Sequence, residues 1–107
     1  MIAHDIVTKD LEHRLRESNL YDLILTETPY KVRGECGECD IIALRGSYAV
    51  VFEIKGKDRP KSRNKAYNQI RRDYRWIKDR FPKVERIFGF YSHLRDKEVV
   101  LEWKINL

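Results

Sequence analysis

Three charged residues have the types and spacing of a site that hydrolyses phosphodiesters. Asp40 opens an apolar segment, and Glu53 and Lys55 lie two apart at the end of the next one. Strand alternation directs residues two apart to the same face, and a hairpin between the segments would bring Asp40 close to Glu53. Two carboxylates so arranged suit a hard cation such as Mg²⁺ or Mn²⁺.

A cation held there would assist hydrolysis, because it neutralises the phosphate, orients a water and lowers the pKa of that water. Lys55 would donate to the phosphate or orient the water, and the carbonyl of Ile54 would help to hold the cation. Alternatively, Glu53 and Lys55 form a surface ion pair worth under about 1 kcal/mol on a half-exposed strand. The preceding sequence AVVF favours the first interpretation, since it predicts a central, buried strand in which charges are costly without a task.

The elements that would position these residues follow from periodicity and turn signals. A helix is predicted over 4–18 and a β-rich segment over 21–32 around Pro29, followed by a Gly-containing linker over 33–38. Strands over 39–44 and 48–54 form a hairpin, and a basic loop over 56–65 leads into a helix from about 62 to 80. Two strands, 84–91 and 97–105, are joined across 92–96. This order predicts a single domain over residues 1–107, a three-layer α/β fold with a mixed central sheet flanked by helices.

The hairpin also resembles a known family. GECDIIALRG followed by SYAVVFEIKGKD resembles the core of the PD-(D/E)XK nuclease superfamily, with Asp40, Glu53 and Lys55 at the motif positions. The order of elements is similar to that family's αβββαβ, restriction-endonuclease-like core. Within the superfamily, the sequence looks most like archaeal Holliday-junction resolvases and similar small endonucleases. The resemblance implies a Mg²⁺-dependent or Mn²⁺-dependent endonuclease that acts on duplex or branched DNA.

The resemblance implies further site residues on the two helices. Glu12 corresponds to the acidic residue that often completes the metal site from the first helix, and is otherwise an ordinary exposed glutamate. Gln69 corresponds to a polar residue on the helix after the Lys motif. The exonuclease branch places a Tyr four residues after this Gln, where the present chain has Asp73, and Tyr74 is expected in the core. Glu38, two residues before the motif aspartate, either supports the metal site or is a solvated loop glutamate.

The charge balance and the basic loop favour a polyanionic partner. The chain has 22 Lys and Arg against 17 Asp and Glu, a formal net charge of +5. Five cations in the loop after Lys55 could contact phosphates beside the scissile one, independently of sequence; they are Lys57, Arg59, Lys61, Arg63 and Lys65. The alternative is a flexible, solvated loop. A homodimer is expected, because so short a chain offers little surface for holding a duplex.

Cys36 and Cys39 leave three alternatives open: half of a zinc site, a disulfide, or free thiols. Free thiols are favoured, since zinc would need two further ligands and the three histidines show no partner spacing. The N-terminal sequence lacks the layout of a signal peptide, and no apolar run approaches the roughly 18 residues that span a membrane, so an intracellular, cytoplasmic protein is expected.

Two other functions remain open. The chain could be a non-catalytic nucleic-acid-binding module on a nuclease fold, since fold does not fix function. It could also be a protein-interaction or toxin–antitoxin type component whose basic charge serves an acidic protein partner.

Overall fold

The protein is described here by a computed structural model that covers residues 3–96 and 98–106, with side chains as far as residue 102. The elements along the chain are α1 (Ala3–Ser18), β1 (Leu23–Val32), β2 (Glu35–Arg45), β3 (Tyr48–Lys55), α2 (Pro60–Arg80), β4 (Arg86–Arg95) and β5 (Glu98–Asn106). This is the predicted order, although Lys97, where the last strand was expected to begin, lies outside the described residues.

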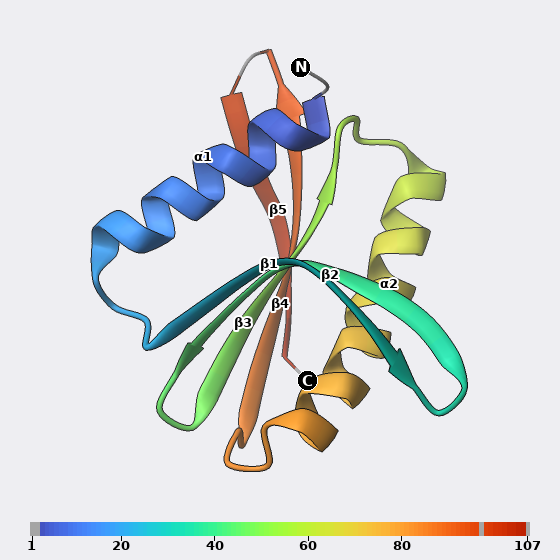
Figure 1. Cartoon of the computed structure of the whole chain (residues 1–107). Helices are drawn as coiled ribbons and strands as arrows, with labels where there is room; N and C mark the ends of the chain where they lie inside the picture. Colours follow the sequence, from blue (N-terminus) through green and yellow to red (C-terminus); the bar gives the residue numbers. More distant parts are fainter. Residues whose placement is uncertain (1–2, 97, 107) are drawn as a thin grey trace.

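The five strands form one mixed sheet in the order β1-β2-β3-β4-β5. Neighbouring strands are antiparallel except β3 and β4, which are parallel because α2 connects them as a crossover. Figure 1 shows α1 and α2 on opposite sides of the sheet. The α/β class and the central position of β3 are therefore confirmed, and the arrangement is compatible with three layers.

Each helix covers its own apolar cluster. The α1 side is centred on Val7, Leu11, Ile41, Val50, Phe52 and Ile54. The α2 side contains Tyr30, Val32, Cys39, Ile42, Leu44, Ala49, Val51, Ile77, Val84 and Ile87. Because both faces of β3 are covered, its six middle residues are all buried.

The hairpin of β1 and β2 is longer than predicted, and the linker expected over 33–38 is wrong. The strands continue to a turn at Arg33 and Gly34, where φ is 51° and 82°. Positive φ at both central residues matches the twist of a two-residue hairpin turn. The glycines that suggested a linker therefore belong to a continuous hairpin.

Two other boundaries also differ from the prediction. Helix α2 begins at Pro60, inside the expected loop, because proline suits the first helical position, where no backbone donor is needed. Strand β4 continues to Arg95, so the segment 92–96 is mostly strand.

Side chains along β1 and β2 alternate between the two faces of the sheet, and this alternation is shifted by one residue at a single point of the hairpin. The pairing of the two strands is interrupted only between Thr26–Ile41 and Thr28–Cys39, which leaves Glu27 opposite Asp40. On β2, Cys39 and Ile42 both join the cluster on the α2 side, although residues three apart in a regular strand face opposite ways. The outer half of the hairpin therefore turns toward α2, and Asp40 lies where the turn occurs.

Within residues 3–96 and 98–106, neither helix combines the length and apolar character needed to cross a membrane.

Candidate metal-binding and nucleic-acid-binding site

Asp40 and Glu53 lie together where β2 and β3 separate. The last paired residues of the two strands are Ile41 and Phe52. Beyond them the Ile54 N–H donates to Asp40 Oδ2 at 2.8 Å, so a carboxylate takes the place of a strand partner. This bond fixes Asp40 next to the end of β3 that carries Glu53.

Glu53 is a carboxyl group that the protein leaves incompletely satisfied. Its side chain is buried, and Oε2 has no hydrogen-bond partner among the described residues. Burial, reinforced by the neighbouring charges of Asp40 and Asp73, raises the pKa of Glu53 to about 10. A buried polar oxygen without a partner is costly, and a cation bound to it would remove that cost. The oxygen donors present therefore fit a hard divalent cation.

The ammonium group of Lys55 lies beside the Asp40 and Glu53 carboxyl groups. Its Nζ lies 3.5 Å from Glu53 Oε1, and both side chains leave the same face of β3. The Lys55 side chain is only partly buried, so its ammonium group can reach solvent or a bound substrate. The structure thus brings together the three predicted residues Asp40, Glu53 and Lys55.

Helix α1 contributes His4 to the contacts of Asp40. His4 Nε2 lies 3.2 Å from Asp40 Oδ1, and the Thr8 hydroxyl donates to the His4 carbonyl at 2.8 Å. Glu12 instead pairs with Arg16 at 2.9 Å, and lies eight residues further along, which is roughly 12 Å along the helix axis. The structure does not bring Glu12 to Asp40. The sequence offered no signal for His4, because this residue belongs to no motif and has no characteristic spacing from another candidate ligand.

Gln69 lies beside the site but is occupied by structural contacts. Its Nε2 is 3.0 Å from the Glu38 carbonyl, 3.1 Å from Tyr30 Oη and 2.9 Å from Asp73 Oδ1. Its Oε1 accepts from Arg72 at 2.9 Å. Gln69 therefore ties α2 to β2 two residues before the motif aspartate. The Glu38 side chain is exposed, and only the backbone of that residue takes part.

Asp73 is fully buried beside these contacts of Gln69. In the sequence, Asp73 stood out only as the residue found where the exonuclease branch has a Tyr. The Tyr30 hydroxyl donates to Asp73 Oδ1, while Oδ2 has no partner among the described residues. Burial raises the pKa of Asp73 to about 6. Gly37 pairs with Tyr30 across the hairpin, and any side chain there would overlap the Tyr30 ring. Gly37 thus allows Tyr30 to reach α2.

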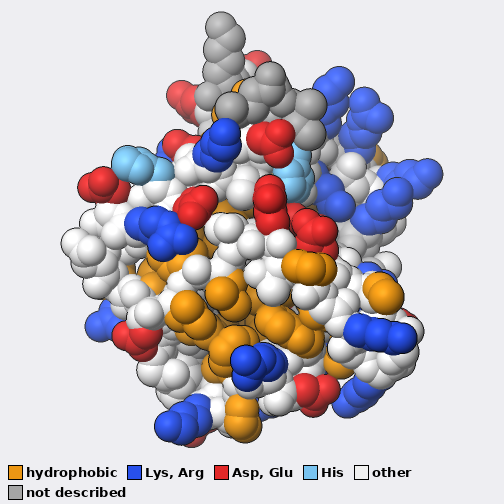
Figure 2. Space-filling model, in the orientation of Figure 1, with side chains coloured by type: hydrophobic (Ala, Val, Ile, Leu, Met, Phe, Trp, Pro, Cys, Tyr) orange, Lys and Arg blue, Asp and Glu red, His pale blue; other side chains and the backbone are white. Residues whose placement is uncertain are grey.

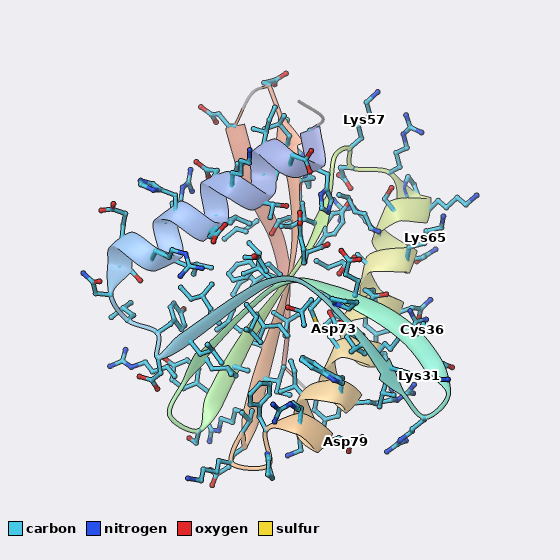
Figure 3. All side chains as sticks on the ribbon, in the orientation of Figure 1. Lys31, Cys36, Lys57, Lys65, Asp73 and Asp79 are labelled. Atoms are coloured by element: carbon cyan, nitrogen blue, oxygen red, sulfur yellow. The ribbon has the colours of Figure 1, made fainter. Side chains whose placement is uncertain are left out.

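The basic residues after Lys55 divide into free and paired cations. Lys57, Arg59, Lys61 and Lys65 are exposed and form no ion pair with the described residues. Figure 2 shows Lys and Arg side chains gathered beside the first turns of α2, and Figure 3 shows Lys57 and Lys65 pointing outward. Arg63 instead donates to both Asp58 oxygens, at 2.7 and 2.8 Å.

Arg63 belongs to an ion-pair network that ties the loop to β4 and β5. Within it, the ligand atoms of Asp58, His93 and Glu102 lie within 4.8 Å of one another, which is close enough to hold a metal ion. Arg63 already lies 3.3 Å from Glu102, and Arg95 lies 2.7 Å from it. The carboxylates are therefore neutralised by arginines, and we interpret the network as a structural clamp.

The two cysteines are free thiols on β2, with Cys36 exposed and Cys39 buried. Burial raises the pKa of Cys39. No disulfide joins the two residues within the chain, and the free-thiol interpretation of the sequence stays a prediction.

Comparison with known proteins assigns no family. No protein family model matches the chain, and no curated protein matches it. Among solved structures, the chain is similar to one described as the crystal structure of SSO0001, with 22% sequence identity over 96% of this chain and a TM-score of 0.44. The chain spans 50% of that protein's length. The functional argument therefore rests on the residues of this chain.

Proposed function

We propose that this protein is a metal-dependent nuclease that hydrolyses phosphodiester bonds of DNA, with a restriction-endonuclease-like core of the PD-(D/E)XK type. The observation that carries the proposal is the buried Glu53 carboxyl, with one oxygen unpartnered, beside Asp40 and Lys55. Because Glu53 is buried on a central strand, the interpretation as a surface ion pair loses its support.

Asp40 and Glu53 would hold Mg²⁺ or Mn²⁺, with help from the Ile54 carbonyl. The cation supplies charge neutralisation at the phosphate and acidifies a water. His4 contacts the oxygen of Asp40 that does not accept from Ile54, so His4 either joins the ligands or leaves when the cation binds. In this proposal Gln69 and Glu12 are not ligands, since each is engaged elsewhere.

Lys55 is the side chain that would act directly on the phosphate or on the attacking water. Its ammonium group, held near Glu53, would donate to a non-bridging phosphate oxygen or orient the attacking water. The charge that develops on the phosphate in the transition state strengthens this hydrogen bond, which is the condition for a catalytic contribution.

The nucleic acid would lie along the flank of α2 that faces this site. Lys61, Lys65 and Gln69 are spaced four apart and so share one side of the helix. Free cations at the first two positions would bind phosphates without reading sequence. A homodimer of the Holliday-junction-resolvase-like type would place two such sites on one duplex or branched DNA. Sedimentation with and without DNA tests that assembly.

The decisive experiment is cleavage of branched, duplex and single-stranded DNA with Mg²⁺ or Mn²⁺. We expect cleavage that is lost on addition of EDTA and reduced by about 100-fold or more in Asp40→Asn, Glu53→Gln and Lys55→Ala, as for other groups that stabilise a transition state. Asp79→Asn is the matched control, because Asp79 is an exposed acid at the far end of α2.

Two outcomes would contradict the proposal. The first is full activity in Glu53→Gln, which would mean that another site acts. The second is tight, salt-sensitive DNA binding without turnover or metal dependence, which would favour the non-catalytic binding module. Absence of any affinity for DNA at low salt would favour a protein-interaction role.

A further inference from the structure

A pocket borders the candidate site at the end of the sheet where β3 stops. The last residue of β3 to pair with β4 is Lys55, opposite His93, whereas β4 continues to Arg95. The chain after β3 and the end of β4 enclose a pocket of about 290 Å³, which is lined by Lys57, Asp58, His93, Leu94 and Arg95. Because paired strands lie roughly 4.8 Å apart, this pocket lies directly beside Lys55.

The size and walls of the pocket suit a single nucleobase. Small-molecule sites are roughly 300–1,000 Å³, so this pocket lies at the lower end of their range. Leu94 supplies an apolar contact, and the Arg95 side chain is 57% exposed, which leaves its guanidinium group accessible. Bases that have left the stack of a helix pack on apolar side chains and on guanidinium groups.

Lys57 adds a positive charge at the same pocket. It is exposed and forms no ion pair with the described residues, and it points outward in Figure 3. It follows Lys55 by two residues, which span at most about 7 Å of extended chain. A phosphate held by Lys57 would therefore be a near neighbour of the phosphate on which Lys55 acts.

Asp58 offers one hydrogen-bond acceptor that the protein does not use. Its Oδ1 accepts from Arg63 at 2.7 Å and from the Tyr91 hydroxyl at 3.0 Å. Among the described residues, Oδ2 accepts from Arg63 alone, at 2.8 Å, while the nearest nitrogens of His93 and Arg95 lie 3.9 Å away, too far for a hydrogen bond. A carboxylate oxygen can accept two hydrogen bonds, so Oδ2 has room for a donor from a ligand.

This acceptor distinguishes among bases. Adenine, cytosine and guanine carry an amino group that can donate to a carboxylate, whereas thymine has a carbonyl oxygen and a methyl group on the corresponding edge. The Asp58 side chain is 22% exposed, so a base in the pocket can reach it.

We propose that this pocket binds one unpaired nucleotide of the cleaved strand, with its phosphate at Lys57 and the amino group of adenine, cytosine or guanine at Asp58. This inference rests on the proposed nuclease function and names the substrate class: DNA in which a nucleotide beside the scissile phosphate is unpaired, as at a branch, a bulge or a single strand. The ion pairs of Asp58 with Arg63 then shape one wall of a binding pocket.

The test is the binding of deoxycytidine monophosphate and thymidine monophosphate to the full chain in EDTA, followed by the amide NMR shifts of residues 57–58 and 93–95. Neither metal nor cleavage is needed. We expect the cytosine nucleotide to bind at least about 10-fold more tightly, because it alone donates to the charged acceptor.

Two variants separate recognition from folding. Lys57→Ala should weaken binding of both nucleotides to a similar degree, and Lys31→Ala, on the hairpin of β1 and β2, is the matched control. Asp58→Asn presents an amide that donates as well as accepts, so it should abolish the preference for cytosine. A purely structural role of Asp58 predicts instead that both nucleotides bind more weakly and that the preference is kept, which would overturn the inference.

Cleavage gives an independent measurement. A duplex with one unpaired cytosine should be cut at least about 10-fold faster than the fully paired duplex, and equal rates would overturn the inference. Cleavage that depends on Asp40, with no shift of the pocket amides by either nucleotide, would sustain the nuclease and overturn the pocket. Cytosine-selective binding without metal-dependent cleavage would sustain the nucleotide pocket and overturn the nuclease function.

Discussion

The Glu53 carboxyl is stabilised by different partners in the metal-free and metal-bound protein. Without a cation, burial and the nearby carboxylates hold its pKa at about 10, so the group folds in its protonated form. A cation requires the ionised form, so binding near neutral pH must release this proton. Metal affinity and the stability of the metal-free protein should therefore change in opposite directions as pH rises.

The stability of the metal-free protein should fall between about pH 5 and pH 9, because over this range the folded state holds a proton on Glu53 that the unfolded state has lost. Glu53→Gln removes this titration, so its unfolding free energy should depend less on pH and should exceed that of the wild type at pH 8. Urea unfolding at several pH values in EDTA measures this. An unchanged slope of stability against pH in the variant would mean that Glu53 is ionised in the folded protein.

His4 predicts a preference among metals. Imidazole nitrogen suits Mn²⁺ and later transition metals better than Mg²⁺, which prefers oxygen donors. If His4 is a ligand, His4→Ala should weaken Mn²⁺ binding by about 10-fold or more and leave Mg²⁺ binding nearly unchanged. Titration calorimetry with each metal measures this, and His13→Ala on an exposed turn of the same helix is the control. A stronger affinity for both metals in His4→Ala would show that His4 competes with the cation for Asp40.

Among the elements, α2 has three functions on different sides. Its buried side packs Ala66, Ile70 and Ile77 against the sheet. One flank carries Lys61 and Lys65 beside the candidate site, while Arg63 is turned toward Tyr91 and the clamp around Asp58. The predicted basic loop is thus partly helical, and the helix directs Lys61 and Lys65 to one side and Arg63 to another.

Lys61→Ala with Lys65→Ala should weaken DNA binding and reduce the magnitude of the salt dependence, log Kd against log salt, by about 2, one for each phosphate contact. Arg63→Ala should instead lower the thermal midpoint, because it removes two hydrogen bonds to Asp58 and an ion pair with Glu102. Fluorescence anisotropy in binding titrations and thermal unfolding distinguish the two. Equal losses of binding slope in both variants would contradict this division.

The contact of α2 with β4 depends on Gly89. A Cβ at this position would lie 2.5 Å from Ile70 Cγ2, and Ile70 is fully buried. Gly89→Ala should therefore cost about 1–3 kcal/mol of unfolding free energy, as overpacking does. Combining it with Ile70→Ala should cost less than the sum of the two single changes, because the shortened side chain makes room. Additive losses in urea unfolding would mean that the clash is relieved elsewhere.

For the whole molecule, the sequence predicted what is local. The order of elements followed from periodicity, and the proximity of Asp40, Glu53 and Lys55 followed from one hairpin and the alternation of β3. It did not predict contacts that join distant segments, such as His4 with Asp40 or Tyr30 with Asp73. The glycines of the first hairpin were misinterpreted, because a turn glycine and a glycine that admits an aromatic ring look like a linker in sequence.

The parallel pairing of β3 and β4 has a consequence for the rate of folding. β2 and β3 are joined by a short turn, and hairpins of this kind form in roughly 1–10 μs. β4 can pair with β3 only after the whole of α2 has crossed the sheet, which is a slower, non-local step. We therefore expect Glu53 to stay hydrated and ionised until the crossover closes, so that the metal-free chain takes up a proton at that late step, because only the folded state raises the pKa of Glu53. Refolding followed by stopped-flow fluorescence in EDTA should slow as pH rises above about 5, and Glu53→Gln should refold at a rate that pH changes little.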